Sequence, residues 1–321
     1  MTPFLFCIFE NEMKNYFSLI SFILCLVLLQ AISKPAHASN ISDRDSSKTS
    51  SSKKSNHYFT IIPSFGAYHY KDYINSPLTY HSVGLLPAFE FGLENRGMNH
   101  SGFTSIFFAY QFMNTDQAQF TGAGPEQFLS FKINTSRCYE LANFWEGRIH
   151  YCLGYDGNFE YNHQVNLRLE NSAYTFAIWA NAGVANRFEF PFTIKTERKI
   201  WFLRFKNPEQ HFLLGWQVNV PLAGVITRPN FSGIRHFANG EFLSNLFSEM
   251  NNHVHLVSLN KFIMVHSQLE LQAPLGNNNR LKIAYAWEGF RYNENFSRVQ
   301  GTMGVIEVGV MFKLDSRAVI Q

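Results

Sequence analysis

The stretch from Val254 to Gln272 alternates between apolar and polar residues over an unusual length. Successive side chains of a β-strand point to opposite faces, so this pattern predicts one two-faced strand. Strands of soluble sheets average about 5–6 residues, whereas a tilted strand that crosses a bilayer needs roughly 9–11. The mostly apolar face comprises Val257, Leu259, Lys261, Ile263, Val265, Ser267, Leu269 and Leu271, and the opposite face comprises Met264, His266, Gln268, Glu270 and Gln272.

The same alternation recurs along the chain, between clusters of Gly, Pro, Asn, Asp and Ser that favour turns. The predicted strands are 58–70, 82–94, 102–113, 126–136, 147–160, 173–184, 187–194, 199–206, 210–226, 255–272, 280–291 and 303–314. Two shorter candidates lie at 138–145 and 163–170. We therefore expect an all-β, antiparallel up-and-down transmembrane β-barrel of about 12 strands, within a range of 10–14.

The connections between these strands give a second indication. In a barrel with both chain ends on the inner side, long outer loops alternate with short inner turns. The expected outer loops are 71–81, 114–125, 161–172, 195–198, 227–254 and 292–302. The expected inner turns are 95–101, 137–146, 185–186, 207–209 and 273–279. Long and short connections alternate at most positions, as the barrel requires.

Composition narrows the classes of protein that fit. Charged residues make up 16% of the chain against an average of about 25%, and aromatic residues also make up 16%. A mean hydropathy of −0.14 excludes a bundle of many membrane helices, and a net charge of +3 gives no support for nucleic-acid binding. A secreted β-sandwich is the soluble alternative, but aromatic residues near the strand ends favour the membrane barrel, in which they form interfacial girdles.

The N-terminus is typical of an exported protein. The apolar run from Tyr16 to Ile32 follows Lys14 and precedes Ala36-His37-Ala38, so residues 1–38 are predicted to be a signal peptide. Translation from Met13 would give a cleaner signal, and an uncleaved membrane anchor is the alternative. Residues 39–56 are rich in Ser and Lys and predict a flexible leader.

Two cysteines remain after the predicted cleavage, Cys138 and Cys152. An exported location permits a disulfide between them. The two cysteines lie 14 positions apart and could link neighbouring strands, but Cys152 can equally be a small residue of the barrel lumen, and the sequence leaves both alternatives open.

From residue 57 to residue 314, the pattern resembles the outer-membrane β-barrel proteins of Gram-negative bacteria, without a motif of any one family. The last predicted strand, from Gly304 to Phe312, is similar to the strand by which such barrels contact their assembly machinery. The resemblance implies an outer-membrane location, with membrane lipid and that machinery as partners. Residues 315–321 would form a short tail.

Charged and polar residues on the inward phase of the strands are the candidates for function. They are Glu90, Glu94, Lys132, Arg148, His150, His266, Gln268, Glu270, Lys282, Glu288 and Glu307. Such residues can pair into a network that fills the lumen, since buried charges are usually paired. They can also line a small hydrated pore. We expect a small channel or transport protein for an unknown solute, with a structural or surface-interaction barrel of blocked lumen as the alternative.

A membrane-embedded lipid hydrolase is the third hypothesis. Nucleophilic catalysis requires a base within hydrogen-bond reach of a serine. His255 and Ser258 have opposite strand parity, and so do His266 and Ser267. No metal-binding spacing and no phosphate-binding glycine loop occurs in the sequence, so no cofactor is predicted.

The longest connection contains apolar residues at helical spacing. They are Phe242, Leu243, Leu246, Phe247 and Met250. We expect a helix within 240–250, which either enters the barrel mouth or membrane interface or packs on neighbouring loops.

Overall fold

The structure is a computed structural model that describes residues 56–76, 78–82, 86–97, 99–115, 126–166, 174–194, 197–200, 203–206, 209–229, 254–294 and 297–314. These residues belong to one compact unit, Ser52–Gln321. The predicted signal peptide, residues 39–55 of the leader, the helix within 240–250 and the tail 315–321 lie outside the described residues.

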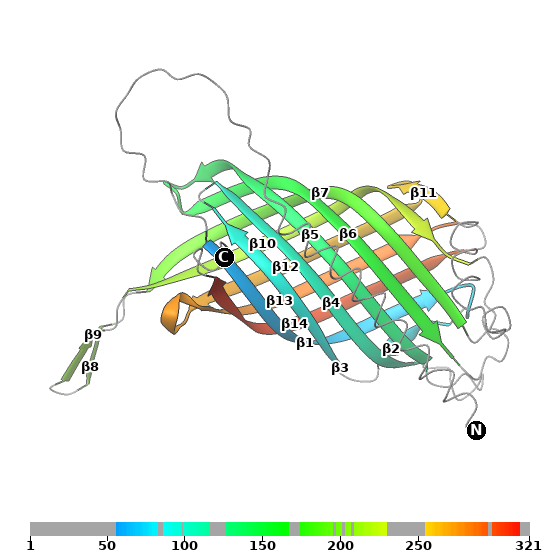
Figure 1. Ribbon diagram of the computed structural model, residues 1–321, viewed down its shortest axis with the longest axis horizontal. Helices are drawn as coiled ribbons and strands as arrows, with labels where there is room; N and C mark the ends of the chain where they lie inside the picture. Colours follow the sequence, from blue (N-terminus) through cyan, green and yellow to red (C-terminus); the bar gives the residue numbers. More distant parts are fainter. Residues whose placement is uncertain are drawn as a thin grey trace, which may run out of the picture. The chain divides into compact units, whose positions relative to one another are not determined.

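Antiparallel strands form nearly all of the regular structure (Figure 1). The strands are β1 (Asn56–Asp72), β2 (Tyr80–Ser82), β3 (Leu86–Arg96), β4 (His100–Asn114), β5 (Glu126–Phe144), β6 (Ile149–Val165), β7 (Tyr174–Ile194), β8 (Glu197–Ile200), β9 (Leu203–Lys206), β10 (Gln210–Thr227), β11 (Val254–Ser258), β12 (Phe262–Pro274), β13 (Arg280–Tyr292) and β14 (Val299–Leu314). A short 3-10 helix, Gly276–Asn278, joins β12 to β13. Among the described residues, no helix is long and apolar enough to span a membrane.

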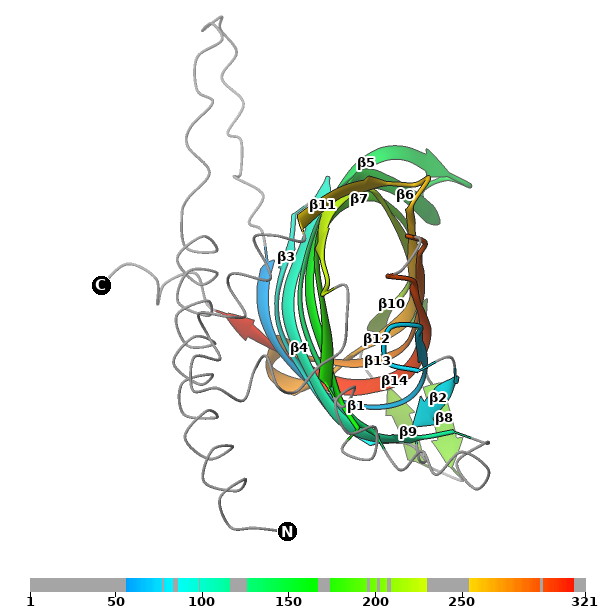
Figure 2. The same ribbon diagram turned by 90° about the vertical axis from the view of Figure 1, so that its right-hand side faces the viewer.

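Twelve of these strands form one sheet that closes into a ring (Figure 2). Closure occurs because β1 pairs with β14 and β7 pairs with β10. The strands β2 and β3 both lie between β1 and β4, while β11 and β12 both pair with β10. Because β2 and β3 share one position and β11 and β12 share another, the twelve strands occupy ten positions around the ring. The predicted all-β, antiparallel up-and-down barrel is confirmed.

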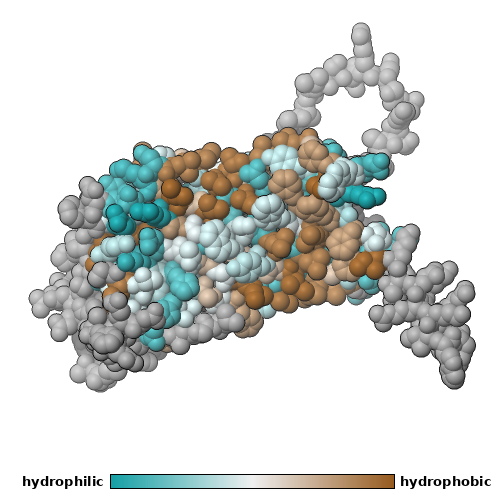
Figure 3. Space-filling view, turned by 180° about the vertical axis from the view of Figure 1, so that it is seen from behind, coloured by the Kyte–Doolittle hydropathy of each residue, from teal (hydrophilic) through white to brown (hydrophobic). Residues whose placement is uncertain are grey.

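The two faces of each strand differ in chemistry, as the alternation requires. On β3, Phe89 and Phe91 are each 48% exposed, whereas Glu90 between them is 6% exposed. On β13, Tyr285 is 51% exposed and Lys282 is 1% exposed. The wall therefore presents apolar side chains outward and polar side chains inward, and Figure 3 shows hydrophobic residues over the middle of one side of the barrel.

Four predicted strands differ from the structure. The predicted turn 185–186 lies in the middle of β7, so 173–184 and 187–194 are one strand. Residues 199–206 do not join the barrel, because β8 and β9 pair only with each other in the described part of the chain. The stretch 255–272 is interrupted by a turn at 259–261, which separates β11 from β12. The shorter candidate 138–145 is largely the end of β5.

The connections divide the barrel into two ends, which we name from their lengths. The turn end has the short connections 97–99, 145–148 and 275–279, together with the start of β1 and the end of β14. The loop end has the connections that follow β1, β4, β6, β10 and β13. The connection after β7, predicted as an outer loop at 195–198, lies instead at the turn end, because β7 is one long strand rather than two.

Candidate functional site

The barrel interior is the candidate functional site, and it has three levels. At the turn end, charged residues form a network around Arg187 and Glu270. In the middle, a cluster centres on Lys132. Toward the loop end, aromatic side chains replace the charges. The order follows from the strands: β12 runs from Phe262 at the loop end, through His266, to Glu270 near the turn end.

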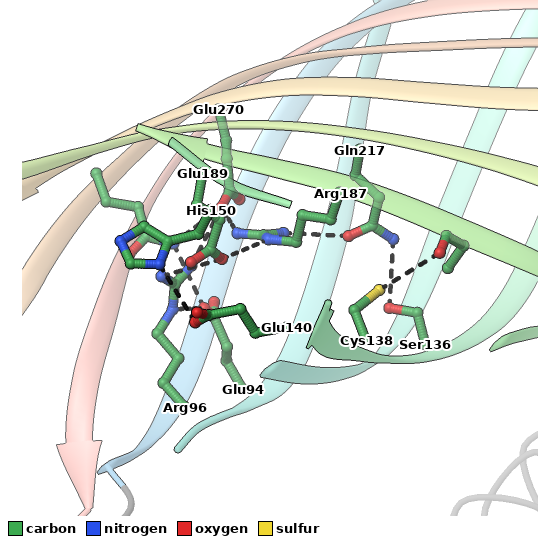
Figure 4. A network of polar contacts seen from close by, with 12 residues as sticks. Glu94, Arg96, Ser136, Cys138, Glu140, His150, Arg187, Glu189, Gln217 and Glu270 are labelled. Carbon is green, nitrogen blue, oxygen red and sulfur yellow. Dashed lines mark hydrogen bonds and ion pairs between the residues drawn. The ribbon is translucent and has the colours of Figure 1, made fainter. Parts of the chain in front are cut away.

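The turn-end network joins residues from β3, β7, β10, β12 and β13, most of which Figure 4 shows. Arg187 Nη2 lies 2.5 Å from Glu270 Oε1, and its Nε lies 2.6 Å from Glu189 Oε1. Arg187 Nη1 also donates a hydrogen bond of 3.1 Å to Gln217 Oε1. A guanidinium suits this role, because its planar set of donors can serve several acceptors at once.

The cations of this network are all paired. Arg96 contacts Glu94 and lies 3.3 Å from Glu270 and 3.6 Å from Glu189. Lys282 Nζ lies 3.4 Å from Glu270 Oε2 and 3.9 Å from Glu307 Oε2. The three cations Arg96, Arg187 and Lys282 therefore each contact at least one carboxylate, which is the pairing that burial of charge requires.

The middle cluster holds Lys132 between two carboxylates. Its Nζ lies 3.3 Å from Glu160 Oε2 and also contacts Glu288. Glu160 accepts a further hydrogen bond from Trp179 Nε1 at 3.2 Å, and His266 Nδ1 lies 3.7 Å from Glu288. Lys132, Glu160 and Glu288 are each at most 3% exposed, so these charges are removed from bulk water.

A cavity of about 50 Å³ adjoins this cluster, and a smaller one of about 10 Å³ adjoins the turn-end network. The larger cavity is lined by Glu90, Asp156, Glu288, Glu307 and His266, among others. At roughly 10–15 Å³ for each water molecule, it has room for about three to five waters. Such waters would serve the buried Asp156 Oδ1, which has no partner within the described structure.

An aromatic layer crosses the lumen on the loop-end side of Lys132. The ring of Trp179 lies 4.9 Å from that of Phe290 and 5.8 Å from that of Phe262. Phe290 contacts Tyr70 at 5.9 Å, and Tyr70 contacts Phe128 at 5.1 Å. The chain of rings thus runs from β12 and β7 through β13 and β1 to β5. Trp179, at the junction of two of these contacts, is fully buried.

A buried ion pair lies between this layer and the loop end. Arg228 Nη2 lies 2.7 Å from Asp72 Oδ1, and its Nε donates to Ser297 Oγ at 3.2 Å. Asp72 Oδ2 accepts a hydrogen bond of 3.4 Å from Thr175. Arg228 therefore connects the segment after β10 with the end of β1 and the β13–β14 connection.

Most of the predicted lumen residues lie inside the barrel. The buried ones are Glu90, Glu94, Lys132, Gln268, Glu270, Lys282, Glu288 and Glu307. His266 is half-buried beside the cavity, and His150 is half-buried at the turn-end rim, where its Nδ1 lies 3.2 Å from Glu140. Arg148 is a correction: it lies exposed in the turn 145–148, because β6 begins at Ile149 rather than at 147.

The sequence pattern does not identify several members of these clusters. Arg187 follows the predicted turn 185–186, and Arg96 lies in the predicted connection 95–101. Asp156 and Glu160 alternate with Tyr155 and Phe159 on β6, so their inward phase was available as a signal.

Cys138 and Cys152 are free thiols in the structure, buried against Ala185. They lie on neighbouring strands but are not directly opposed, since Cys138 pairs with Gly154 and Cys152 pairs with Glu140. Of the two alternatives that the sequence left open, the structure has the unbridged one.

The hydrolase candidates are not brought together. Ser258 Oγ donates to Asn260 Oδ1 at 2.7 Å, and Ser267 Oγ accepts from Trp216 Nε1 at 3.1 Å on the outer face.

The described residues contain no group of three or more His, Cys, Asp or Glu side chains placed to hold a metal ion. At the loop end, a hydrogen bond from Lys261 to Glu294 of 2.9 Å lowers the pKa of the Glu294 carboxyl.

No protein-family model matches the sequence, and no curated protein matches it significantly. Among solved structures, the chain is similar to the outer membrane protease OmpT from Escherichia coli, with 7% identity, a TM-score of 0.40, and 81% of this chain and 96% of that chain covered. It is also similar to the Neisserial surface protein A, with 7% identity, a TM-score of 0.33, and coverages of 80% and 97%. A third is the toluene transporter TodX of Pseudomonas putida, with 6% identity, a TM-score of 0.30, and coverages of 80% and 89%. These names describe different activities, and the likeness assigns none of them to this chain.

Proposed function

We propose that the protein is a closed barrel of the outer membrane of a Gram-negative bacterium. In this proposal the strands anchor the chain in the bilayer, and the connections at the loop end take part in surface interactions. The observation that carries it is the filled lumen, in which an aromatic layer and two clusters of paired charges follow one another along the barrel axis.

The outer wall supports the membrane setting. A strand that crosses a bilayer needs roughly 9–11 residues. The strands β4 to β7 contain 15, 19, 17 and 21 residues, so each is long enough. Large apolar side chains such as Phe108, Trp216 and Ile306 are 40–50% exposed on this wall. In water such a surface would drive aggregation, whereas in hydrocarbon it is the favourable one.

The number of strand positions favours a closed lumen and argues against an open channel. Eight-stranded barrels have interiors that side chains fill, and aqueous channels are found at 16–18 strands. A ring of ten strand positions is closer in size to the side-chain-filled barrels than to the aqueous channels. Trp179 and Tyr292 are fully buried inside the barrel, and burial of rings this large leaves little room for a solute path.

A liposome-swelling experiment tests this proposal. The mature protein is reconstituted at known density into liposomes, and swelling is followed after dilution into an isosmotic small sugar, with a 16-stranded porin as positive control. Folding is verified beforehand by the heat-dependent change in gel migration. We expect a folded protein and no swelling above protein-free liposomes. Swelling that increases with protein density would refute the closed barrel.

A small channel is the second candidate, and the polar cavity of about 50 Å³ favours it. For that function the rings around Trp179 would have to separate and join the cavity to the loop end. The swelling experiment distinguishes the two functions directly.

A further inference from the structure

We propose that a set of basic residues on the outer face of the loop end, here called the basic rim, binds the phosphate of a membrane-lipid headgroup. The basic rim comprises Lys71, Arg291 and Arg298, with Tyr73 between two of them. This inference rests on the membrane setting of the proposed function and adds a ligand to the outer wall.

The register places two of the cations in one row across three adjacent strands. Arg291 on β13 pairs with Gln300 on β14, and Gln300 pairs in turn with Lys71 on β1. All three positions have the outward phase of their strands. Neighbouring strands lie about 4.8 Å apart, so the backbones at Arg291 and Lys71 are about 10 Å apart. Long side chains from both positions can reach one phosphate.

The ring of Tyr73 lies between Arg298 and Lys71 and brings these two cations close together. Lys71 Nζ lies 4.8 Å from the centre of the Tyr73 ring, and Arg298 Cζ lies 5.3 Å from it. The backbone N–H of Tyr73 donates to the carbonyl of Arg298 at 3.1 Å, which fixes the turn after β1 against the β13–β14 connection. Arg298 Nε also donates to Asn293 at 2.9 Å. Lys71 and Arg298 are thus held in position before any ligand binds.

The basic rim carries positive charge that no described carboxylate neutralises. Neither Lys71, Arg291 nor Arg298 forms an ion pair with an acidic residue in the described part of the chain. The two nearby carboxylates have other partners: Asp72 faces inward to Arg228, and Glu294 lies 2.9 Å from Lys261. A charged row of this kind on a membrane protein is complementary to an anion, and phosphate accepts the donors of both Arg and Lys.

The position of the basic rim relative to the apolar wall selects a lipid as the source of that phosphate. On β13, Trp287 is 39% exposed and lies four residues from Arg291 toward the turn end. Four residues of a strand span about 13 Å, or about 10 Å along the membrane normal at a tilt of roughly 40°. Because Trp side chains mark the membrane interface, the cations lie at the level of the headgroups. Phe65 and Ile306, each 50% exposed, lie below them and can contact the acyl chains.

Retention of a defined lipid tests the proposal. The detergent-purified barrel is mixed with phosphatidic acid, which has an exposed phosphate, or with oleate, which has a carboxylate on a similar chain. Bound lipid is counted by native mass spectrometry, and inorganic phosphate is titrated as a competitor. The variant replaces three residues, as Lys71→Gln, Arg291→Gln and Arg298→Gln. The matched control is Lys261→Gln, which removes a cation from the same end that already has a carboxylate partner.

We expect wild type and Lys261→Gln to retain phosphatidic acid in preference to oleate. The triple variant should bind it on the order of 100-fold more weakly, from about fivefold for each cation near a membrane surface. Equal retention by the triple variant, equal retention of oleate by wild type, or displacement by millimolar inorganic phosphate would overturn the lipid site. Heat-dependent gel migration verifies that each variant is folded. Failure here with no liposome swelling would leave the closed barrel standing, whereas swelling with lipid retained would reject the closed barrel alone.

Discussion

Replacement of Lys132 by Met measures how dry the middle of the barrel is. Lys132 is 3% exposed and is paired with Glu160 and Glu288. Loss of one partner from a buried ion pair costs about 3–5 kcal/mol, because the remaining charge is left uncompensated. In a water-filled pore, the same pair would contribute about 0–1 kcal/mol. The Lys132→Met variant therefore distinguishes a filled lumen from a hydrated one by its stability.

The assay is urea unfolding in detergent or lipid, read by the heat-dependent change in gel migration. With a slope of about 3 kcal/mol per molar urea, the predicted loss lowers the unfolding midpoint by about 1–2 M. Lys261→Met is the control, since this lysine forms an exposed ion pair and its loss should change stability by about 1 kcal/mol or less. Combining Lys132→Met with Glu160→Gln and Glu288→Gln should recover most of the loss, because no unpaired charge remains.

A Lys132→Met variant within about 1 kcal/mol of wild type would refute this reasoning. It would mean that bulk water reaches the cluster and that the aromatic layer does not separate the cluster from the solvent at the loop end. Failure of the triple combination to recover stability would assign the loss to packing of the lysine stem instead of its charge.

Three further predictions concern the layer, the wall and the thiols. Trp179→Ala should cost about 3–5 kcal/mol in the same urea assay without causing liposome swelling, because the charged levels still fill the lumen; swelling would show that Trp179 alone closes the barrel. Phe91→Arg on the outer wall should destabilise the membrane-inserted barrel by about 2–4 kcal/mol, measured by refolding into lipid vesicles at graded urea, and folding as efficient as wild type would place this position outside the hydrocarbon. Cys138 and Cys152 should react with a maleimide only after unfolding, as followed by intact mass, and rapid labelling of the folded protein would show that the turn end admits the reagent.

The fold class was predictable because its signal is local. The alternation of Phe89, Glu90 and Phe91 predicts which side chains face lipid and which face the interior. The same pattern is present in the other strands of the barrel. The strand limits were less predictable. Asn186 is a residue type that favours turns, yet the structure buries its neighbour Ala185 within β7 and gives Asn186 a hydrogen bond from the Tyr151 hydroxyl at 3.0 Å.

The partners inside the barrel were not predictable from one sequence. Lys132 meets Glu288 across 156 positions of the chain, and Arg187 meets Glu270 across 83. Which residues meet across such separations depends on the register of every intervening strand pair, and the alternation does not specify that register. The aromatic layer was missed for a related reason. Aromatic residues were expected on the lipid face, whereas Trp179 is buried inside the barrel and Phe290 has the same inward phase as Lys282 and Glu288.

Single-channel conductance of the wild-type protein in a planar bilayer tests the closed barrel most directly. The measurement uses the mature chain after its folded state has been verified, in symmetric potassium chloride, with a porin as the positive control. A filled lumen predicts a silent bilayer at moderate voltage, even when labelled protein is shown to be inserted. Reproducible unitary current steps, absent without protein, would contradict the account.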